Sequence, residues 1–308
     1  MPWIATIVLV AVLTACTREA PQNAATTAAG EVNSSLTVIT VNYPLAYFAE
    51  RILGDHGSVS FPVPADVDPA YWSPEPAVIA EYQQADLILL NGAGYAAWVA
   101  NATLPRSRLV DTTAAIRERL IPIESAVTHT HGPTGDHSHG GVAFTTWLDL
   151  SIAVEQARTI LEAVVFVRPQ HEADFRTAFA ALESDLVELD SGLQRKSVQM
   201  GKELVVFSHP VYQYLERRYN LHGFSVHWEP DEVPEEAHWR QLQSVLQQHP
   251  ATIMIWEAGP LEDTRRRLLD LGVESVVFMP GGNRPAEGDW LSLMTEGLAA
   301  LDRQYKGH

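Results

Sequence analysis

The stretch LTVITVNYPLAYFAERILG, residues 36–54, combines a strand pattern and a helix pattern. Residues 36–41 form a compact run with several β-branched side chains, which favours a strand. From Pro44 onward, apolar side chains recur at the helical spacing i, i+3, i+4, i+7 and i+8: Leu45, Phe48, Ala49, Ile52 and Leu53. Gly54 follows at the position where helices commonly end. The stretch therefore predicts a buried strand followed directly by an amphipathic helix.

The same alternation continues along the chain. Further strands are predicted at 58–63, 86–91, 108–110, 204–208, 223–226, 252–256 and 275–278. Further helices are predicted at 73–84, 95–102, 211–219, 235–248, 261–271 and 290–301. Ser73 followed by Pro74 is typical of an N-cap with proline at the first helical position. Such alternation predicts an α/β protein of two lobes, 36–168 and 200–308, each with a parallel sheet flanked by helices.

One long helix is predicted between the two lobes, at residues 169–199. Its apolar stripe repeats with helical period: Phe175, Ala178, Leu182, Leu186, Leu189 and Leu193. About 30 residues of α-helix span about 45 Å, which is long enough to run along both lobes. We therefore expect a single rigid helix to join the lobes, and an ordinary core helix with a frayed end is the alternative.

The amino terminus has the pattern of a targeting segment. Residues 3–13 are apolar apart from Thr6, which is too short a run to span a membrane. This pattern predicts a signal peptide at 1–15. The sequence Leu-Thr-Ala-Cys ending at Cys16 resembles the bacterial lipoprotein box, in which the cysteine is lipidated; an ordinary signal peptide with an incidental cysteine is the alternative. Residues 16–35 lack apolar periodicity and predict a flexible tether.

Composition narrows the possible partners and metal ligands. The chain has 308 residues, 21 Lys plus Arg and 38 Asp plus Glu, which gives a net charge of −17. A phosphate backbone would be repelled by such a surface, so we expect no nucleic-acid partner. With a single cysteine, neither an intramolecular disulfide nor a cysteine-based zinc cluster can form. A metal site would have to be built from histidine and carboxylate side chains.

Four of the 12 histidines fall in one loop, residues 128–141, with the sequence THTHGPTGDHSHGG. They form two His-x-His pairs around a Gly/Pro-rich bend: His129, His131, His137 and His139. This stretch cannot form a core element because it lacks large apolar residues. Neutral imidazole is a common metal ligand, so the stretch is a candidate metal-binding loop, with a solvated loop of no function as the alternative.

Potential metal ligands also follow four of the predicted strands. The donors are Asp66 and Asp68 after 58–63, His209 after 204–208, His227 and Glu229 after 223–226, and Glu257 after 252–256. In parallel α/β sheets, ligands bind in the loops at the carboxyl ends of strands. The joint placement of these donors therefore predicts a binding site there.

Several stretches resemble the zinc/manganese solute-binding proteins of bacterial ABC importers, the cluster A-I family. They are VNYPL (41–45), QADLILLNG (84–92), TWLD (146–149) and SHPVYQYL (208–215) running into RYNL (218–221). The His-rich loop also lies just before TWLD, as in zinc-specific members. The resemblance implies two α/β lobes joined by a rigid helix, and a role in capturing a divalent metal outside the inner membrane for a permease.

The family ligands are only partly present. The resemblance implies that His209 is the third family histidine, whereas Asp68 is the donor nearest to the first. Thr145 stands where the family has its second histidine, and Met279 where it often has a carboxylate. Glu257 is the substitute we name for the latter. We therefore expect His137 or His139 to join His209, with Asp68 or Glu257 contributing oxygen, and we assign His129 and His131 an accessory role.

Together these features predict a monomeric binding protein, not an enzyme, anchored by lipid on Cys16 in the periplasm or at the cell surface. It would capture Zn²⁺, in preference to Mn²⁺, for an ABC permease. Three alternatives stay open: a zinc buffer without a permease, a zinc hydrolase with an open coordination position, and a binder of a metal chelate or small organic ligand. For the last, Tyr71, Trp72 and Trp228 would form the walls.

Overall fold

The computed structural model describes residues 1, 3, 35–123, 128–130, 136–138 and 141–305. The chain separates into two units, Met1–Ser34 and Ser35–His308, and everything below concerns the second. Cys16, His131 and His139 lie outside the described residues, as does nearly all of the predicted signal peptide and tether. Within the described part, no helix is both long and apolar enough to cross a membrane.

The first lobe is built on a parallel four-stranded sheet in the order β2-β1-β3-β4. Its strands are β1 (Leu36–Thr40), β2 (Gly57–Ser60), β3 (Leu87–Leu90) and β4 (Leu109–Asp111). The helices between them are α1 (Tyr43–Leu53) and α2 (Pro76–Gln84), with short 3₁₀ turns η1 (Gly54–His56), η2 (Ala97–Asn101), η3 (Arg106–Arg108) and η4 (Ala114–Arg119). Asn42 caps α1 by accepting a hydrogen bond from the Leu45 N–H, as the strand–helix pattern requires.

The second lobe repeats this plan with the parallel order β10-β9-β11-β12. Its strands are β9 (Leu204–Phe207), β10 (His222–Ser225), β11 (Ala251–Trp256) and β12 (Glu274–Val277). Its helices are α5 (Gln213–Tyr219), α6 (Glu236–Gln248), α7 (Glu262–Asp270) and α8 (Trp290–Gln304). The predicted α/β class with two parallel sheets is therefore confirmed.

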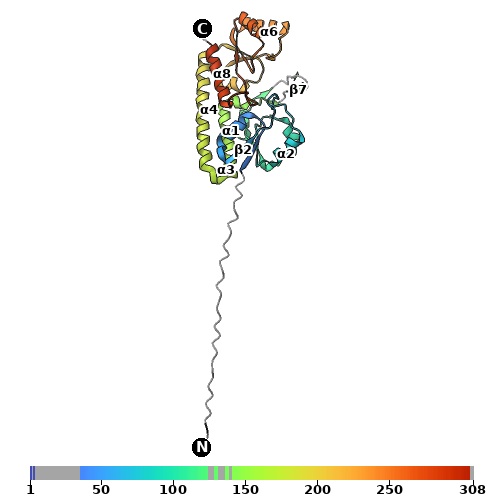
Figure 1. The fold of residues 1–308 in the computed structure, drawn as a ribbon. Coiled ribbons are helices and arrows are strands. Elements are labelled where there is room, and N and C mark those ends of the chain that lie inside the picture. The colour runs from blue at the N-terminus through green and yellow to red at the C-terminus, as the bar shows by residue number, and fades with distance from the viewer. Residues whose placement is uncertain (2, 4–34, 124–127, 131–135, 139–140, 306–308) are drawn as a thin grey trace. The chain divides into compact units, whose positions relative to one another are not determined.

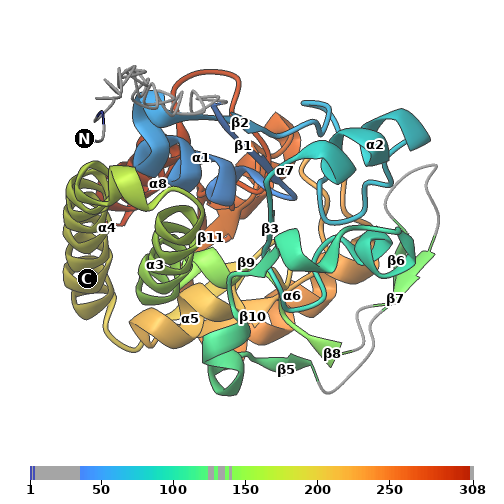
Figure 2. The same cartoon turned by 90° about the horizontal axis from the view of Figure 1, so that it is seen from below.

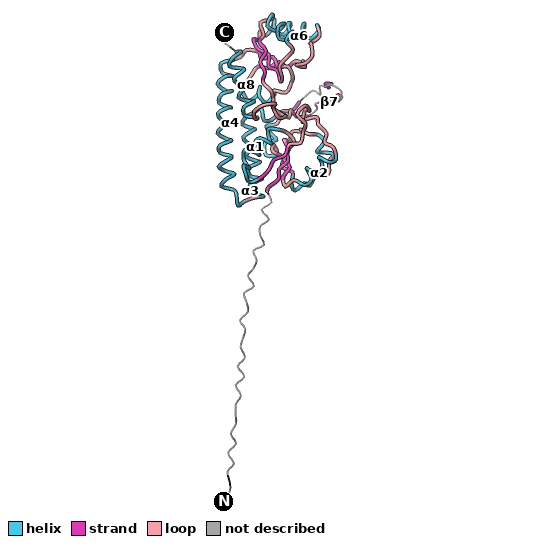
Figure 3. Tube along the Cα trace, viewed as in Figure 1, coloured by secondary structure: helices cyan, strands magenta, loops and turns pink. Residues whose placement is uncertain are grey.

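A long helix, α4 (Glu172–Met200), runs along both lobes (Figures 1 and 3). It follows α3 (Leu150–Val167) and the short turn η7 (Pro169–His171). It packs on α1 and α3 of the first lobe and on α8 and α5 of the second, burying an apolar stripe: Phe175, Phe179, Leu182, Leu186, Leu189 and Leu193. The predicted joining helix is confirmed, and its 29 residues are about 44 Å long.

The helical side of the molecule is also where the lobes share a core. The view in Figure 2 shows α1, α3, α4 and α8 grouped together, with β6 and β7 on the opposite side. Phe48 of α1 meets Trp290 of α8 edge to face with ring centroids 5.1 Å apart, and both side chains are fully buried. The two lobes are thus joined along this side by packed apolar side chains.

Local predictions differ from the structure in three places. The helix predicted at 95–102 is only the 3₁₀ turn η2, because the left-handed backbone of Ala96 prevents a helix from starting before it. The helix predicted to start at Ser73 and Pro74 begins instead at Pro76, with Glu75 as N-cap. The reason is steric, because Pro76 disfavours helical backbone at Glu75 and so delays the start. The helix α3 was not predicted at all. Asp149 caps it by accepting hydrogen bonds from the N–H groups of Ser151 and Ile152.

Two short antiparallel pairs lie at the base of the His-rich loop and within it. The strand β5 (Pro122–Ile123) pairs with β8 (Gly141–Val142), and β6 (Thr128–Thr130) pairs with β7 (Asp136–Ser138). In the second pair the backbone of His129 lies opposite that of His137. The pairing of β5 with β8 therefore brings together the two chain segments that connect the His-rich loop to the first lobe.

Candidate metal centre

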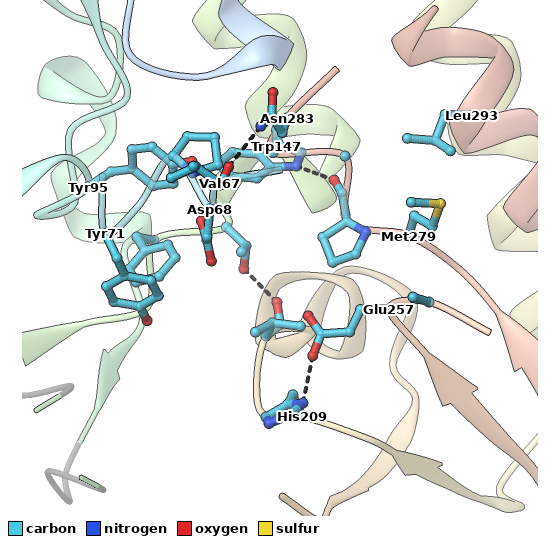
Figure 4. A pocket seen from close by; sticks show the side chains of 18 of the residues that line it. Val67, Asp68, Tyr71, Tyr95, Trp147, His209, Glu257, Met279, Asn283 and Leu293 are labelled. Carbon is cyan, nitrogen blue, oxygen red and sulfur yellow. Dashed lines mark hydrogen bonds and ion pairs between the residues drawn. The ribbon is translucent and has the colours of Figure 1, made fainter. Parts of the chain in front are cut away.

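A cavity of about 760 Å³ opens between the two lobes (Figure 4). The first lobe contributes the loop after β2 and the segment before α3, whereas the second contributes the loops after β9, β10, β11 and β12. The cavity thus lies where the carboxyl ends of both parallel sheets face each other, which is the usual ligand-binding edge of such sheets. Its polar lining includes Asp68, His209, His227 and Glu257.

His209 is the centre of the second lobe's contribution. It follows β9, the strand that lies between β10 and β11, and only 4% of it is exposed. Its Nδ1 lies 2.6 Å from Oε1 of Glu257, which follows β11. Its Nε2 lies 3.2 Å from Oε1 of Glu229, which follows β10. Three neighbouring strands therefore place one imidazole between two carboxylates.

This arrangement changes the protonation of the imidazole. Burial lowers the pKa of His209, but the hydrogen bonds and charges of Glu229 and Glu257 outweigh burial and raise it to about 9. In the metal-free protein, the two carboxyl groups that face the imidazole nitrogens therefore favour the protonated form of His209. A divalent metal ion that displaces a proton from one ring nitrogen would meet the carboxylate that faces that nitrogen, and imidazole and carboxylate are both ligands suited to zinc.

The first lobe brings Asp68 to the opposite wall. Its carboxylate accepts a hydrogen bond of 2.8 Å from the Ala70 N–H and its backbone carbonyl accepts from Tyr71 and Trp72, so the loop turns tightly at this residue. The side chain of Tyr71 is close enough to both walls to be affected by each. Burial raises the pKa of Tyr71, and the charges of Asp68 from the first lobe and Glu257 from the second raise it further. Asp68 and Glu257 therefore face the same cavity from different lobes (Figure 4).

Hydrogen bonds between the lobes fix the width of the cavity. The hydroxyl of Thr145 donates to the Val211 carbonyl at 2.6 Å, and the Trp147 indole donates to the Pro280 carbonyl at 2.7 Å. The Asn283 amide donates to the Val67 carbonyl at 2.8 Å. Thr145 is 5% exposed. At the position of the second family histidine, the chain therefore has a buried hydroxyl that joins the lobes.

The structure brings three of the predicted ligands to one cavity: His209, Glu257 and Asp68. Met279 lines the same cavity, so the place of the family carboxylate is taken by a thioether. For His129 and His137 the structure describes the backbone of β6 and β7 only, and His131 and His139 lie outside the described residues. Their predicted contribution to the site stays a prediction.

The aromatic walls differ in part from the prediction. Tyr71 lines the cavity, together with Tyr95, Phe144 and Trp147. Trp228 was wrong as a wall, because it is 3% exposed and packs against Trp239 and Trp256 inside the second lobe. Trp72 was wrong as well, because it packs against Trp98 of the first lobe.

Glu229 and His227 were recognised as donors at a strand end but were left out of the predicted ligand set. Glu229 contacts His209, whereas His227 is exposed at the cavity with its ring centroid 6.1 Å from that of His209. Knowledge of the strand order would have selected these two residues, since they follow β10 and β10 lies next to β9, the strand that His209 follows.

Residues 38–304 match the family described as zinc-uptake complex component A, periplasmic. The chain belongs to this family. It is similar to the high-affinity zinc uptake system protein ZnuA of Bacillus subtilis, with 24% identity over 275 residues that cover 86% of each protein. It is also similar to the zinc-binding lipoprotein AdcA of Streptococcus pneumoniae, with 22% identity over 282 residues. That match covers 88% of this chain and 56% of AdcA.

Among solved structures, the metal-dependent lipoprotein YcdH of Bacillus subtilis has the same fold, with a TM-score of 0.75 and 21% identity. The match covers 87% of this chain and 98% of that structure. The predicted resemblance to cluster A-I solute-binding proteins is thus confirmed. Since the family consists of solute-binding proteins of ABC transporters, the prediction of a binding protein rather than an enzyme is confirmed too, and the zinc hydrolase alternative is set aside.

Proposed function

We propose that this chain captures Zn²⁺ in the cavity between its lobes and delivers it to the permease of an ABC importer. The observation that carries the proposal is the position of His209 between Glu229 and Glu257, opposite Asp68. Two carboxylates of the second lobe contact the imidazole, and Asp68 of the first lobe lines the same cavity. A metal ion bound among them would be enclosed by the two lobes, as suits a carrier that must hold its cargo until it docks.

The proposed ligands are His209, Glu257 and Asp68, completed by His137 or His139 from the His-rich loop. Thr145 does not complete the set, because its hydroxyl donates to a backbone carbonyl and a neutral hydroxyl is a poor zinc ligand. Zinc commonly takes four ligands from histidine and carboxylate side chains. His129 and His131 would gather zinc near the entrance. Imidazole favours zinc over manganese, which prefers an all-oxygen site.

Zinc-dependent stabilisation tests this function. A ligand that binds only the folded state stabilises it by about 2.7 kcal/mol at a hundredfold excess over its Kd. Zinc should therefore raise the melting temperature of chelator-stripped protein, and magnesium should not. The variant His209→Gln should lose most of the zinc-dependent rise, whereas His249→Gln, a change of an exposed histidine, should keep it. An unchanged rise in His209→Gln would place the tightest zinc site elsewhere.

The proposed location and partners follow from the amino terminus and the family. Relatives include proteins named as lipoproteins, such as AdcA. We propose that Cys16 carries a lipid that anchors the protein outside the cytoplasmic membrane, in the periplasm or at the cell surface, beside its permease. We expect the mature protein to be a monomer. A zinc buffer that serves no permease would show the same metal binding but would not support zinc uptake when restored to a strain that lacks this protein.

A second candidate ligand is a metal chelate, because the cavity is much larger than a bare ion. Its volume is about 760 Å³, and the rings of Tyr71 and Tyr95 both meet Phe144 edge to face in its wall. Such a wall can pack against a small organic ligand around the metal. This alternative requires that zinc mixed with an organic chelator raises the melting temperature while free zinc does not.

A further inference from the structure

A cluster of metal-binding side chains lies at the opposite edge of the first sheet from the cavity. His56 ends η1 and directly precedes β2, so it sits at the amino edge of that sheet. His171 and Asp174 lie where η7 leads into α4. In Figure 1 this junction is at the end of the first lobe, where α3 meets α4 beside β2. The cluster is therefore separated from His209 by the length of the sheet.

The three side chains are close enough to share an ion. Nε2 of His56 lies 3.0 Å from Oδ2 of Asp174. The rings of His56 and His171 are stacked, with centroids 4.1 Å apart and an interplanar angle of 26°. One ligand atom from each residue lies within 4.8 Å of the other two. Ligands of a tetrahedral zinc are about 3.4 Å apart, so modest rotation of the imidazoles would bring all three to coordination distance.

One aromatic ring packs against both imidazoles. Phe175, which is fully buried in the first turn of α4, meets the ring of His56 edge to face at 5.6 Å and that of His171 at 6.0 Å. The backbone of the residue after His56 is fixed by pairing of Gly57 with Leu36 in the sheet. The donors are thus presented by ordered elements, which reduces the conformational entropy lost when an ion binds.

We propose that His56, His171 and Asp174 form a second zinc site, distinct from the cargo site in the cavity. Two imidazoles and one carboxylate are a common set of three protein ligands for zinc, with water in the fourth position. The side chain of Asp174 is 66% exposed and that of His56 is 31% exposed, so an ion could reach this site directly from solvent. Bound zinc would connect η1 to the first turn of α4 and stabilise the junction between the first lobe and the joining helix.

The test removes the cavity site first, so that it does not depend on the proposed function. In the full chain carrying His209→Gln and lacking residues 129–139, calorimetric titration with zinc should still find one equivalent. Adding Asp174→Asn, His56→Gln or His171→Gln should weaken that equivalent at least about tenfold, since even loss of an outer partner of a metal ligand costs about 10- to 100-fold. Adding His249→Gln instead should leave it unchanged.

Cobalt(II) gives a second readout. A site with two imidazoles and one carboxylate should produce a visible absorption band in the same background, and the Asp174→Asn variant should lose it. Because Asp174 is exposed, this variant is the least prone to misfold, and a thermal melt without metal verifies its fold. If the background binds no zinc, or if Asp174→Asn and His171→Gln bind it as before, the cluster is only an ion pair beside stacked rings and the proposal is wrong.

Discussion

Nδ1 of His209 lies 2.6 Å from Oε1 of Glu257, and the two residues follow adjacent strands of one parallel sheet, β9 and β11. This contact places a carboxylate from one loop against an imidazole from the next, inside a cavity shared by both lobes. The second imidazole nitrogen faces Glu229 from the strand on the other side. The metal-free site is thus organised around one histidine from which a divalent cation can displace a proton.

The first prediction concerns Glu257. Replacing it by Gln removes one carboxylate of the proposed zinc site and leaves Glu229 as the carboxylate that contacts His209. We expect zinc affinity to fall at least about tenfold, the lower end of what loss of an outer partner of a metal ligand costs. Competition against a chromophoric chelator measures it. Glu287→Gln, which changes an exposed carboxylate outside the cavity, should have no effect, and equal affinities in both variants would contradict the assignment.

Thr145 gives a prediction about stability rather than metal binding. Its hydroxyl donates a 2.6 Å hydrogen bond from the first lobe to the Val211 carbonyl of the second. Thr145→Val keeps the shape but leaves the carbonyl without this donor, which should cost about 1 kcal/mol of unfolding free energy. Thr145→Ser should cost less because the hydroxyl remains. Chemical denaturation checks this, and a loss of zinc affinity as large as that of His209→Gln would show instead that Thr145 is a ligand.

A pH dependence of stability should arise at Glu216 in α5. Its carboxylate packs so closely against β10 that a Cβ atom at Gly223 would lie 2.0 Å from its Oε2, so any larger residue at 223 would require the Glu216 carboxylate to shift. Burial raises the pKa of Glu216 from 4.5 to about 7. The folded state therefore favours the protonated form of Glu216. The contribution of this residue to the free energy of unfolding is fully present below pH 4.5 and is lost as the pH rises through about 7.

The variant Glu216→Gln should therefore gain stability relative to the wild type as the pH rises from 4.5 to about 7, by up to about 1.4 kcal/mol per pH unit within this window. Urea unfolding at several pH values measures the difference. Glu287→Gln serves again as the exposed control. A difference between Glu216→Gln and wild type that is constant across these pH values would mean that Glu216 titrates normally in the folded protein.

A fourth prediction concerns the membrane anchor. If Cys16 is lipidated, Cys16→Ser should release the protein from the membrane fraction or leave an unprocessed precursor. Mass spectrometry of the wild-type amino terminus should find the corresponding lipid. Unchanged fractionation together with an unmodified wild-type cysteine would leave the ordinary signal peptide as the better interpretation.

Much of the fold could be predicted because its elements carry local patterns. The apolar stripe of α4 repeats over its whole length, and β1 and α1 are each marked by their own periodicity. In contrast, α3 is broadly apolar, and its start is set by the Asp149 carboxylate. That residue was interpreted from the sequence only as part of the TWLD motif. The start of α2 depended on which of two prolines, Pro74 or Pro76, begins the helix.

The site was predictable only to the level of strand ends. His209 and Glu257 were placed correctly at a common edge because parallel strands end there together. The order of the strands in space could not be read from the sequence. In that order β10 and β11 flank β9, and this brings Glu229 and Glu257 to opposite sides of His209. Alternation beyond β10 then decides that Trp228 enters the core, whereas His227 is exposed at the cavity.

The last prediction tests whether the His-rich loop completes the cargo site. Ala143 and Phe144 line the cavity, and the paired strands β5 and β8 hold the loop's arms just before them. His139 and His137 precede Gly141, the first residue of the paired strand β8, by two and four residues, which span up to about 7 Å and 13 Å of extended chain. Gly140, between His139 and β8, carries no side chain that would restrict the backbone there.

Deleting residues 129–139 should therefore weaken the same tightest zinc site that His209→Gln weakens, while the pairing of Ile123 with Gly141 preserves the base of the loop. The measurement is a zinc titration that resolves the tightest equivalent from weaker ones. His137→Gln and His139→Gln, made singly, should identify which imidazole takes part. If the deletion removes only weak additional equivalents and the tightest site survives, the loop gathers zinc at the surface, and the cavity completes its site with a side chain already in its wall, such as His227, or with Glu229 beside His209.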